Sequence, residues 1–268
     1  MSLTPDQIAW AADALIEAEE TRRQIGLLSL RHPEMTLDDA YAIQAAQMPL
    51  KAAQGCHIIG WKIGLTSKVM QEALGIDTPD SGVLYDDMLF DHGATVPRGR
   101  YIQPRVEAEI AFVMKAPLAG EVSRDEVLAA TDYVVPALEI LDTRILRQDP
   151  DTGETRRIVD TVSDNAANAG IVLGAERHDP AGVDLRWVGA IVKKGGAVVT
   201  TGLGAAVLDD PVTSLVWLSR RMGQYGQRIE AGQVVLSGSF IGPLECPPGT
   251  AIDADFGHFG QASVRFAE

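Results

Sequence analysis

Apolar and polar positions alternate most clearly between residues 104 and 113, which read PRVEAEIAFV. Val106 and Phe112 belong to the apolar series, and Glu107 and Glu109 belong to the polar one, with a period of two that predicts a β-strand. Side chains two residues apart on a strand share a face and lie roughly 6.5 Å apart along it. The two glutamates are therefore expected to point to the same side of a sheet, opposite the apolar side chains.

The same analysis predicts helices at the start of the chain and mostly strands after it. Apolar residues recur at helical spacing over 5–25, and again from Thr36, whose pairing with Asp39 resembles a capping box, to about residue 53. Further helices are predicted over 66–75, from Ser123 and from Pro211, and strands over 58–63, 83–90 and around Glu139, then a hairpin at Gly195-Gly196 and strands near 232–243, 250–257 and 261–267. We therefore expect an α+β protein, with a helical cap over 1–55 and a mixed, mainly β core over 56–268.

Two interpretations fit the paired glutamates. The plainest is a solvated polar face on a half-buried strand. The alternative is half of a site for a hard cation, because two carboxylates so close repel each other unless a cation or a proton lies between them. Glu139, near the end of the apolar run VVPALEILD, offers a third carboxylate. Three carboxylates without a neighbouring His or Cys suit Mg²⁺ or Mn²⁺ better than zinc.

Charged residues interrupt two of the predicted strands. Lys62 lies inside the apolar run 58–63, although lysine is rarely buried without a partner. Its amine either reaches the surface along the sheet or lies beside the carboxylates, where it would bind an anion or transfer a proton. Asp86 and Asp87 interrupt the strand predicted over 83–90, so they either flank a bulge or place one carboxylate in a pocket.

Candidate anion-binding positions lie in the second half of the chain. The segment 147–170 is polar and has few core residues, and loops of this length are usually functional or disordered. Arg156 and Arg157 within it either are solvated or bind a carboxylate through the fork of the guanidinium group. The strand near residue 236 runs into a Gly/Ser turn, whose backbone N–H groups and Ser239 suit an anion.

Composition limits the compartment and the partners. The 268 residues carry a net charge of −14, which argues against nucleic acid and anionic membranes but not against a small anion held by a local cation. No apolar run reaches the roughly 18 residues of a membrane span, and the N-terminus lacks the basic start and apolar run of a signal peptide. The two cysteines indicate no disulfide framework, so a cytoplasmic location is expected.

Six segments, in this order along the chain, resemble one enzyme family: GWKIGLTS, DSGVLYDDMLF, PRVEAEIAFV, ATDYVVPALEILD, DTVSDNAANAG and LSGSF. The family is the hydratase/decarboxylase branch of the fumarylacetoacetate hydrolase superfamily, and the resemblance extends from about Leu27 to Phe266. It implies a mixed, largely β roll or barrel-like core with a small helical N-terminal region. It also implies a homo-oligomer, a pentamer or a decamer among the hydratases.

The resemblance also assigns roles to individual residues. Glu107, Glu109 and Glu139 match the carboxylates with which the family binds a metal, usually Mg²⁺, and Lys62 matches a pocket lysine expected to transfer a proton or contact the substrate carboxylate. The segments that carry Asp86, Asp87, Ser163 and Ser239 match segments that line the pocket. Asp86 or Asp87 would join Lys62 in catalysis, and the two serines would contact substrate. Independently of the resemblance, the length and basic content of the loop 147–160 in an otherwise acidic chain predict that Arg156 or Arg157, or a neighbouring cation, holds the distal carboxylate of a dicarboxylic substrate.

The implied activity is a metal-dependent lyase reaction in the degradation of aromatic compounds such as homoprotocatechuate. The enzyme would add water to the dienol form of a 2-oxo-heptenedioate, giving 4-hydroxy-2-oxoheptane-1,7-dioate, with Mg²⁺ stabilising an enolate at the 2-oxo group. A 2-oxopent-4-enoate hydratase and a 4-oxalocrotonate-type decarboxylase remain alternatives, although the decarboxylases carry PKVEPEIAF and DNASS where this chain has PRVEAEIAF and DNAAN. A non-catalytic subunit that contacts a pathway aldolase or decarboxylase is a third possibility, which the retained carboxylates and Lys62 disfavour.

Overall fold

The computed structural model describes residues 2–68, 71–72, 76 and 78–268. Its helices are α1 (Pro5–Thr21), α2 (Leu28–Arg31), α3 (Leu37–Ala53), α5 (Arg124–Ala130), α6 (Ile158–Ser163) and α7 (Pro211–Gly223). Its strands are β1 (Ile58–Gly64), β2 (Asp80–Tyr85), β3 (Leu89–Phe90), β4 (Thr95–Val96), β5 (Arg105–Met114), β6 (Thr131–Leu141), β7 (Asn168–Leu173), β8 (Gly189–Lys194), β9 (Ala197–Leu203), β10 (Val234–Ser239), β11 (Leu244–Glu245), β12 (Ala251–Asp255) and β13 (Gln261–Phe266). The fold is α+β, as predicted.

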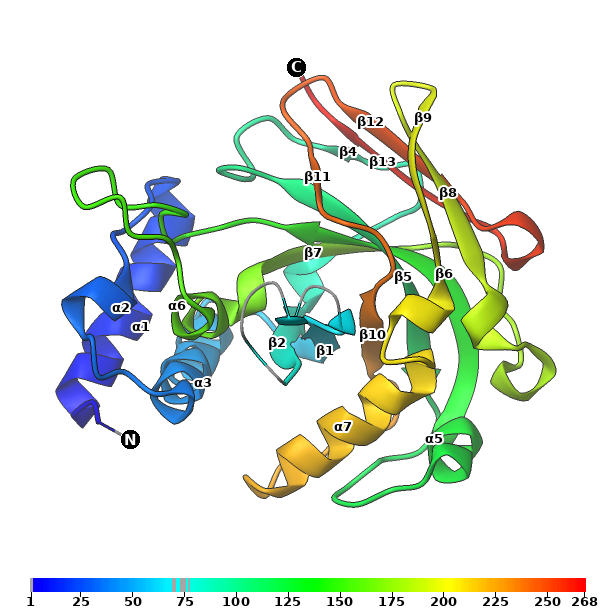
Figure 1. The fold of residues 1–268 in the computed structure, drawn as a ribbon, viewed down its shortest axis with the longest axis horizontal. Coiled ribbons are helices and arrows are strands. Elements are labelled where there is room, and N and C mark those ends of the chain that lie inside the picture. Colours follow the sequence, from blue (N-terminus) through cyan, green and yellow to red (C-terminus); the bar gives the residue numbers. More distant parts are fainter. Residues whose placement is uncertain (1, 69–70, 73–75, 77) are drawn as a thin grey trace.

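Two sheets form the core (Figure 1). The larger sheet has the order β2-β1-β10-β5-β6-β7-β3, with β11 paired to β5, and the smaller has the order β4-β13-β12-β8-β9. The larger sheet curls until β2 comes close to β7, and the side chain of Asn165 closes the gap. The Asn165 amide accepts a hydrogen bond from Val83 N over 2.7 Å and donates one to Val83 O over 2.9 Å, as a strand neighbour would.

The curled sheet has two different faces. Its inner face is filled at one end by the apolar side chains Leu84, Ala111, Val135, Ala137, Ile171 and Leu236. Its outer face packs against α5, α7 and the smaller sheet through a large cluster that includes Val106 and Phe112. Glu107 and Glu109 lie on the inner face, because they alternate with this outer series. The opposition predicted from the alternating pattern is confirmed.

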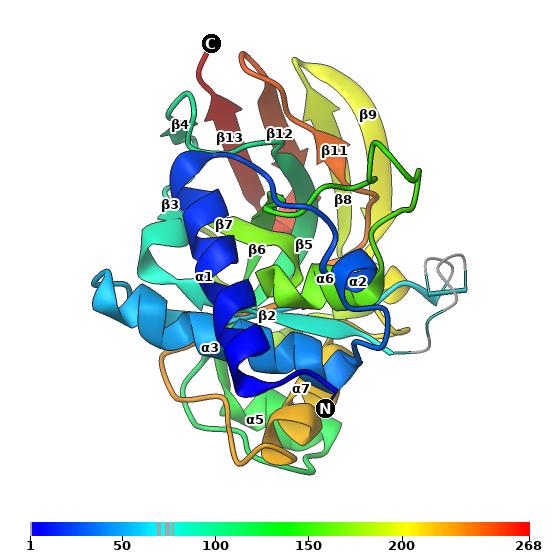
Figure 2. The same cartoon turned by 90° about the vertical axis from the view of Figure 1, so that its left-hand side faces the viewer.

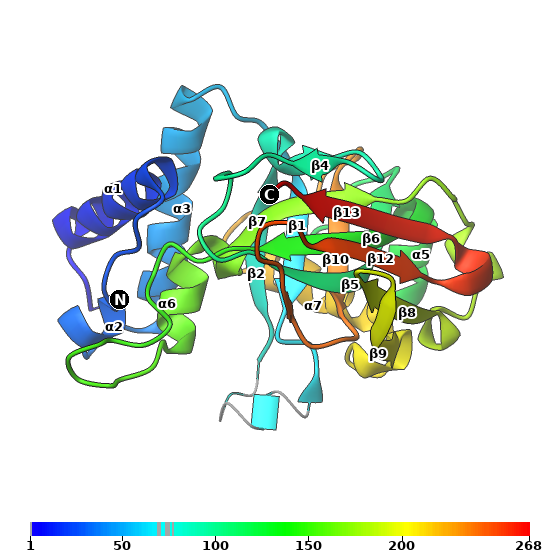
Figure 3. The same cartoon turned by 90° about the horizontal axis from the view of Figure 1, so that it is seen from above.

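The N-terminal helices lie together beside the curled sheet (Figures 2 and 3). Their apolar cluster includes Leu15 and Ile43, but also Ile145 and Val162 from much later in the chain. The predicted capping box of α3 is confirmed, with Thr36 and Asp39 each accepting a hydrogen bond from the other's backbone N–H. The division of the chain at residue 55 stays a prediction, because α6 completes the helical cluster. No helix in the described residues is long and apolar enough to cross a membrane.

Several predicted boundaries were wrong for identifiable reasons. The strand predicted over 83–90 starts at Asp80 and is broken by a 3₁₀ turn over Asp86–Met88. Gly82 follows residues of turn-like composition, Pro79 to Ser81, but it lies within β2, where a Cβ atom would come within 2.5 Å of Asn165 O, so close approach rather than turning requires glycine. The helix predicted over 66–75 falls largely outside the described residues.

Other segments also differ from their predicted form. The helix predicted over 5–25 ends at Thr21, because Arg22 adopts a left-handed conformation with φ 58°. The helix from Ser123 ends at Ala130, where β6 begins. The second half of the polar segment 147–170 is not an open loop, since most of its residues from Val159 onward are buried. The hairpin at Gly195-Gly196 and the helix from Pro211 were predicted correctly.

Candidate functional site

Three carboxylates converge on the inner face of the curled sheet. Glu107 and Glu139 oppose each other directly on the antiparallel strands β5 and β6, and Glu109 follows two residues along. One carboxylate oxygen from each of the three lies within 4.8 Å of the others. Glu109 and Glu139 are fully buried, whereas Glu107 is partly exposed, so the cluster opens to solvent on one side.

In each of the two buried carboxylates, only one of the two oxygens accepts a hydrogen bond from the part of the protein that the structure describes. Glu109 Oε2 accepts a hydrogen bond from Gly238 N over 2.8 Å, and Glu139 Oε1 accepts one from Asn168 Nδ2 over 2.7 Å. Within the described residues, Glu109 Oε1 and Glu139 Oε2 have no hydrogen-bond partner. Leaving a buried charged acceptor unpaired is costly, so these oxygens are explained best by a ligand that they would bind. A set of carboxylate oxygens suits a divalent hard cation such as Mg²⁺ or Mn²⁺.

Electrostatics supports the same interpretation. Burial, and then the negative charge of Glu139, raise the pKa of Glu107 to about 8. Burial and the charges of Glu139 and Glu107 raise the pKa of Glu109 well above its usual range. The carboxylates therefore repel one another when all are ionised, and a bound cation would remove that repulsion.

Lys62 lies beside these carboxylates and is fully buried. Its Nζ is 3.5 Å from Glu139 Oε1 and 3.7 Å from Asp80 Oδ1. Burial alone would lower the pKa of Lys62, but the charges of Glu139 and Asp80 outweigh that effect and raise it above its ordinary value. These neighbouring carboxylates favour the ammonium form of Lys62, which can donate a proton or a hydrogen bond. It does not reach the surface, which excludes one of the two interpretations of its position.

Asp80 completes this group, and sequence analysis missed it. The residue is buried, burial raises its pKa, and its Oδ1 has no hydrogen-bond partner in the described residues. It faces Lys62 across Gly64, where a Cβ atom would come within 2.3 Å of Asp80 Oδ1 and 2.7 Å of Lys62 Nζ. A larger residue at this position would displace the ends of both side chains, so glycine favours this pair. The signal was hidden because Pro79, Asp80 and Ser81 have the composition of a turn.

Asn168, the partner of Glu139, is held by an unusual turn. Asn165, Ala166 and Ala167 all adopt left-handed backbone conformations, with φ of 50°, 49° and 59°, although none of them is glycine. Such conformations cost free energy and persist where the surroundings impose them, often at functional sites. The amide of Asn165 fixes the turn to Val83. The family resemblance covers this DNAAN segment, but no local pattern in the sequence marks Asn168 as a contact of the carboxylates.

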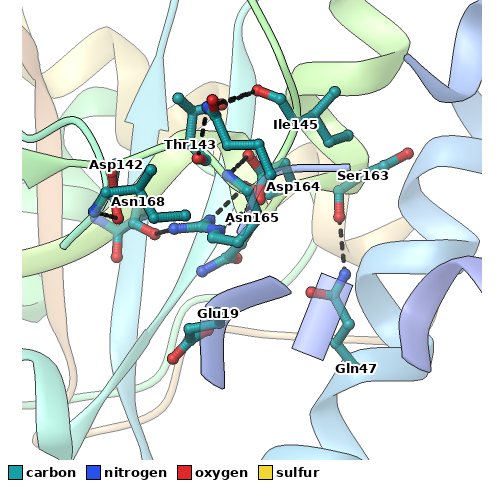
Figure 4. A network of polar contacts seen from close by, with 12 residues as sticks. Glu19, Gln47, Asp142, Thr143, Ile145, Ser163, Asp164, Asn165 and Asn168 are labelled. Atoms are coloured by element: carbon teal, nitrogen blue, oxygen red, sulfur yellow. Dashed lines mark hydrogen bonds and ion pairs between the residues drawn. The ribbon is translucent and has the colours of Figure 1, made fainter. Parts of the chain in front are cut away.

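A second buried charged group contacts the turn, and Figure 4 shows its member Asp164 close to Asn165 and Asn168. Arg144 Nε donates to Asp164 Oδ1 over 2.5 Å, and Arg144 N donates to Asp164 Oδ2 over 2.9 Å. The same guanidinium donates through Nη2 to Asp164 O and through both terminal nitrogens to Asn168 O. Both charged side chains are buried and fully paired. Arg144 and Asp164 therefore fix the backbone on both sides of the strained turn.

The two predicted serines occupy different places. Ser239 opposes Glu109 in register, beside the metal-binding candidates, and its hydroxyl donates to Ile241 O over 2.8 Å. Ser163 is buried in α6, and its hydroxyl donates to Val159 O over 2.8 Å. Gln47 of α3 donates to Ser163 O over 2.7 Å, a contact drawn in Figure 4. The N-terminal helices therefore hold the segment that precedes the turn.

The two arginines predicted to bind substrate also lie in different surroundings. Arg156 is partly buried, and its Nη1 donates to Thr143 Oγ1 over 2.6 Å. Arg157 is exposed, and its Nη1 lies 3.5 Å from Pro33 O at the surface of the N-terminal helices. Of the two, Arg156 is the one whose charge acts on Asp80.

Asp86 and Asp87 have partners at the surface. Both are exposed, with Asp86 Oδ2 3.1 Å from His57 Nδ1 and Asp87 Oδ2 3.1 Å from Arg100 Nη2. Together with Cys56 they bring possible ligand atoms within 4.8 Å of one another, in a group separate from the three glutamates. Their catalytic role stays a prediction, and Asp80 is the aspartate that lies beside Lys62.

Comparison with known proteins gives a consistent family. No protein-family model matches the chain. The chain is 44% identical to a 2-oxo-hept-4-ene-1,7-dioate hydratase from Escherichia coli, over 95% of this chain and 96% of the relative. It is 41% identical to a 2-keto-4-pentenoate hydratase from Paraburkholderia xenovorans, over 98% and 96% of the two chains.

A solved structure agrees over nearly the full length. The 4-oxalocrotonate decarboxylase from Pseudomonas putida G7, complexed with magnesium and adipate, matches with a TM-score of 0.92 and 34% identity, covering 99% of both chains. A fumarylpyruvate hydrolase from Pseudomonas aeruginosa, 11% identical with a TM-score of 0.58, shares the fold alone. The chain therefore belongs to the hydratase and decarboxylase branch of the fumarylacetoacetate hydrolase superfamily, a branch of lyases.

Proposed function

We propose that this protein is a metal-dependent hydratase that adds water to the dienol form of a 2-oxo-heptenedioate. The observation that carries the proposal is the group of three carboxylates with unpaired buried oxygens, set beside a buried ammonium ion. The 44% identical relative, named for this reaction, supports the choice of substrate class. The relative that was solved with magnesium and adipate supports a divalent cation and a dicarboxylic ligand.

Glu107, Glu109 and Glu139 would hold the cation, with Mg²⁺ the first choice and Mn²⁺ the second. When bound, the cation supplies Lewis acidity toward the carboxylate and 2-oxo group of the substrate. The glutamates orient that end of the substrate. The apolar side chains that fill one end of the inner face exclude water from it. Ser239, opposite Glu109, is placed to contact the same end of the substrate.

Lys62 and Asp80 would move the protons. The 2-hydroxyl group of the dienol gives up its proton and the Lys62 ammonium donates a proton to carbon 5, which leaves an enone that is electrophilic at carbon 4. Asp80, when ionised, takes a proton from the water that attacks carbon 4 and returns one to Lys62 across the 3.7 Å that separates them. Carbon 3 of the resulting enolate takes up a proton equivalent to the one that the 2-hydroxyl group released, so the proton count balances, with one water added and no redox cofactor consumed.

A same-branch decarboxylase is the second candidate. The observation that supports this candidate is the 34% identical decarboxylase that superposes over 99% of the chain. Both reactions use an enolate of a 2-oxo acid, so the carboxylates alone do not separate them. The shorter 2-oxopent-4-enoate is the second candidate substrate, supported by the 41% identical hydratase. A non-catalytic partner subunit is disfavoured, because a scaffold gains nothing from unpaired buried carboxylates.

Turnover of dienols of different chain lengths tests the proposal. Purified protein with Mg²⁺ is mixed separately with enzymatically generated five-carbon monoacid and seven-carbon diacid dienols and with 4-oxalocrotonate, and the product mass is recorded. A gain of one water on the seven-carbon diacid is expected. Loss of carbon dioxide from 4-oxalocrotonate would favour the decarboxylase, and no reaction with any of them would contradict the enzyme proposal. We further propose a cytoplasmic homo-oligomer, a pentamer or decamer, that contacts a pathway aldolase or decarboxylase.

A further inference from the structure

Three arginines gather at the outer end of the face that carries the glutamates. Arg105 shares this face with Glu107, because alternate residues of β5 point the same way. Arg105 Nε donates to Glu245 Oε1 over 2.6 Å, and Arg147 Nη1 lies 3.5 Å from the same oxygen. One exposed carboxylate is therefore shared by two guanidinium groups.

Arg156 joins this group through the backbone of its loop. Arg156 N donates to Arg147 O over 2.9 Å, and Gln148 is bridged to Thr155 in antiparallel fashion. Residues opposed on an antiparallel pair point to the same side, so Arg147 and Arg156 face the same way. Like charges directly opposed destabilise such a pair. The loop therefore places two cations together, which an anion between them would stabilise.

These cations are short of acceptors. In the part of the chain that the structure describes, no carboxylate lies within 4.0 Å of the Arg156 guanidinium, whose hydrogen bond goes to the Thr143 hydroxyl. Burial lowers the pKa of Arg156 below its ordinary value; the charges of Asp164 and Asp160 oppose this effect, and those of Arg144 and Arg105 add to it. Arg147 Nε and Nη1 are buried and donate no hydrogen bond within the described residues. In the described part of the chain, Arg147 Nη1 has only the 3.5 Å ion pair with Glu245, and buried guanidinium N–H groups without hydrogen-bond acceptors suit a carboxylate.

The arginine group lies within electrostatic reach of the metal-binding candidates. Burial raises the pKa values of Asp80 and Glu107, and the charges of Arg156 and Arg105 partly oppose that rise. Along β5, the Arg105 side chain leaves the sheet roughly 6.6 Å beyond that of Glu107. A chain of several carbon atoms covers this separation.

We propose that Arg105, Arg147 and Arg156 bind the distal carboxylate of a dicarboxylic 2-oxo acid whose 2-oxo end lies at the three glutamates. The inference rests on the proposed function and extends it, because it names the group that selects a diacid over a monoacid. Arg156 is the central member, since it has no ion pair to lose. In an otherwise acidic protein, this local excess of positive charge also draws a dianion toward the site.

Calorimetric titration with two stable ligands tests the assignment without turnover. The Mg²⁺-loaded protein is titrated with 2-oxoadipate and with 2-oxohexanoate, which differ only in the distal carboxylate. Wild-type protein should bind the diacid more tightly. Arg156→Met should weaken binding of 2-oxoadipate roughly 10–150-fold, the loss expected for a charged hydrogen-bond pair, and leave 2-oxohexanoate within about twofold.

Further variants make the result decisive. Arg228→Met removes an exposed arginine paired with Glu230 and should leave both affinities unchanged. Arg156→Lys keeps the charge without the fork, so an intermediate loss confined to the diacid is expected, and this variant carries the test if Arg156→Met does not fold. An unchanged diacid preference in both Arg156 variants, or a larger loss in Arg157→Met, would overturn the inference. Wild-type protein that binds neither acid would instead contradict the proposed function, whereas equal binding of both acids would contradict this inference alone.

Discussion

Two groups of buried charges lie side by side in this protein, and they are completed in opposite ways. Arg144 and Asp164 form a pair in which each charge has protein partners, including backbone groups on both sides of the strained turn. Glu109 and Glu139 each keep one oxygen without a partner in the described residues, and Lys62 offsets only part of the negative charge. The first group is complete in the protein alone, and the second is complete only with a cation.

The contrast offers a practical way to separate structural from functional charges. Both groups are equally buried, so burial alone does not distinguish them. The number of hydrogen-bond and ion-pair partners does distinguish them. A structural ion pair must find its partners when the chain folds, whereas a ligand site keeps acceptors unpaired at some cost in stability. The two groups meet at Asn168, which accepts from Arg144 through its carbonyl and donates to Glu139 through its amide.

The largest effect is expected on kcat when Lys62 is replaced, because Lys62 lies beside carboxylates that each keep one oxygen without a hydrogen-bond partner in the described residues. Lys62→Met should lower kcat by roughly 10²–10⁴-fold, the usual contribution of a general acid, because the variant keeps the shape of the side chain but carries no proton. Metal affinity should change much less, because the glutamates remain. Steady-state hydration kinetics beside a metal titration of the same sample measures both. A defect seen mainly in KM would show that Lys62 anchors the substrate instead.

Removing one charge of the Arg144–Asp164 pair should lower the free energy of unfolding. Arg144→Met leaves Asp164 as a buried charge without its counterion, and removal of one partner of a buried pair costs about 3–5 kcal/mol. Urea unfolding followed by circular dichroism measures the loss. Saturating Mg²⁺ should not restore the lost free energy, beyond the stabilisation that it gives to the wild-type protein. A loss below about 1 kcal/mol would show that this pair does not hold the turn.

The unsatisfied group should make the metal-free protein sensitive to pH. The pKa of Glu107 is raised from 4.5 to about 8, because of burial and then the charge of Glu139. Between these values the folded protein holds a proton that the unfolded chain has lost, so the free energy of unfolding should fall as pH rises from about 4.5 to about 8. Glu107→Gln should flatten this part of the profile, and saturating Mg²⁺ should cancel or reverse it. Identical slopes in the wild type and the variant would contradict the account.

The smallest effect concerns the turn that joins the two groups. Ala166 has a left-handed backbone with φ 49°, which glycine adopts without the cost of a Cβ atom. Ala166→Gly should therefore leave stability unchanged or raise it by up to about 1 kcal/mol. Ala190→Gly in β8 is the control, and it should destabilise the protein, because a buried strand residue gains nothing from glycine. Equal losses in both variants would show that the turn is not strained.

Sequence patterns were sufficient where one local rule decided the structure. The period-two alternation around Glu107 and Glu109 predicted their shared face, because the pleat of a strand is independent of its neighbours. The capping box of α3 was likewise visible, since Thr36 and Asp39 satisfy backbone groups within four residues. Lys62 stood out because charge inside an apolar run is rare.

The remaining site residues depend on contacts between distant segments. The sequence around Asp80 has the composition of a turn. The place of Asp80 in the site depends on two glycines that allow close approach: Gly64, beside Asp80 and Lys62, and Gly82, beside Asn165. Arg144 and Asp164 are twenty residues apart, and no periodicity links them. The left-handed turn before Asn168 contradicts the local preference of alanine, so only the surrounding fold explains it.

The central claim is that the three glutamates form a divalent cation site, and metal-dependent stability of Glu109→Gln tests it most directly. Thermal unfolding of metal-free wild type and Glu109→Gln is recorded at pH 8, with and without Mg²⁺ or Mn²⁺. Without metal, the variant should melt at a higher temperature than the wild type, because one repelling charge is gone. With metal, the wild type should gain stability and the variant should gain little. A wild-type Tm that neither ion raises, or a variant that gains as much as the wild type, would contradict the account.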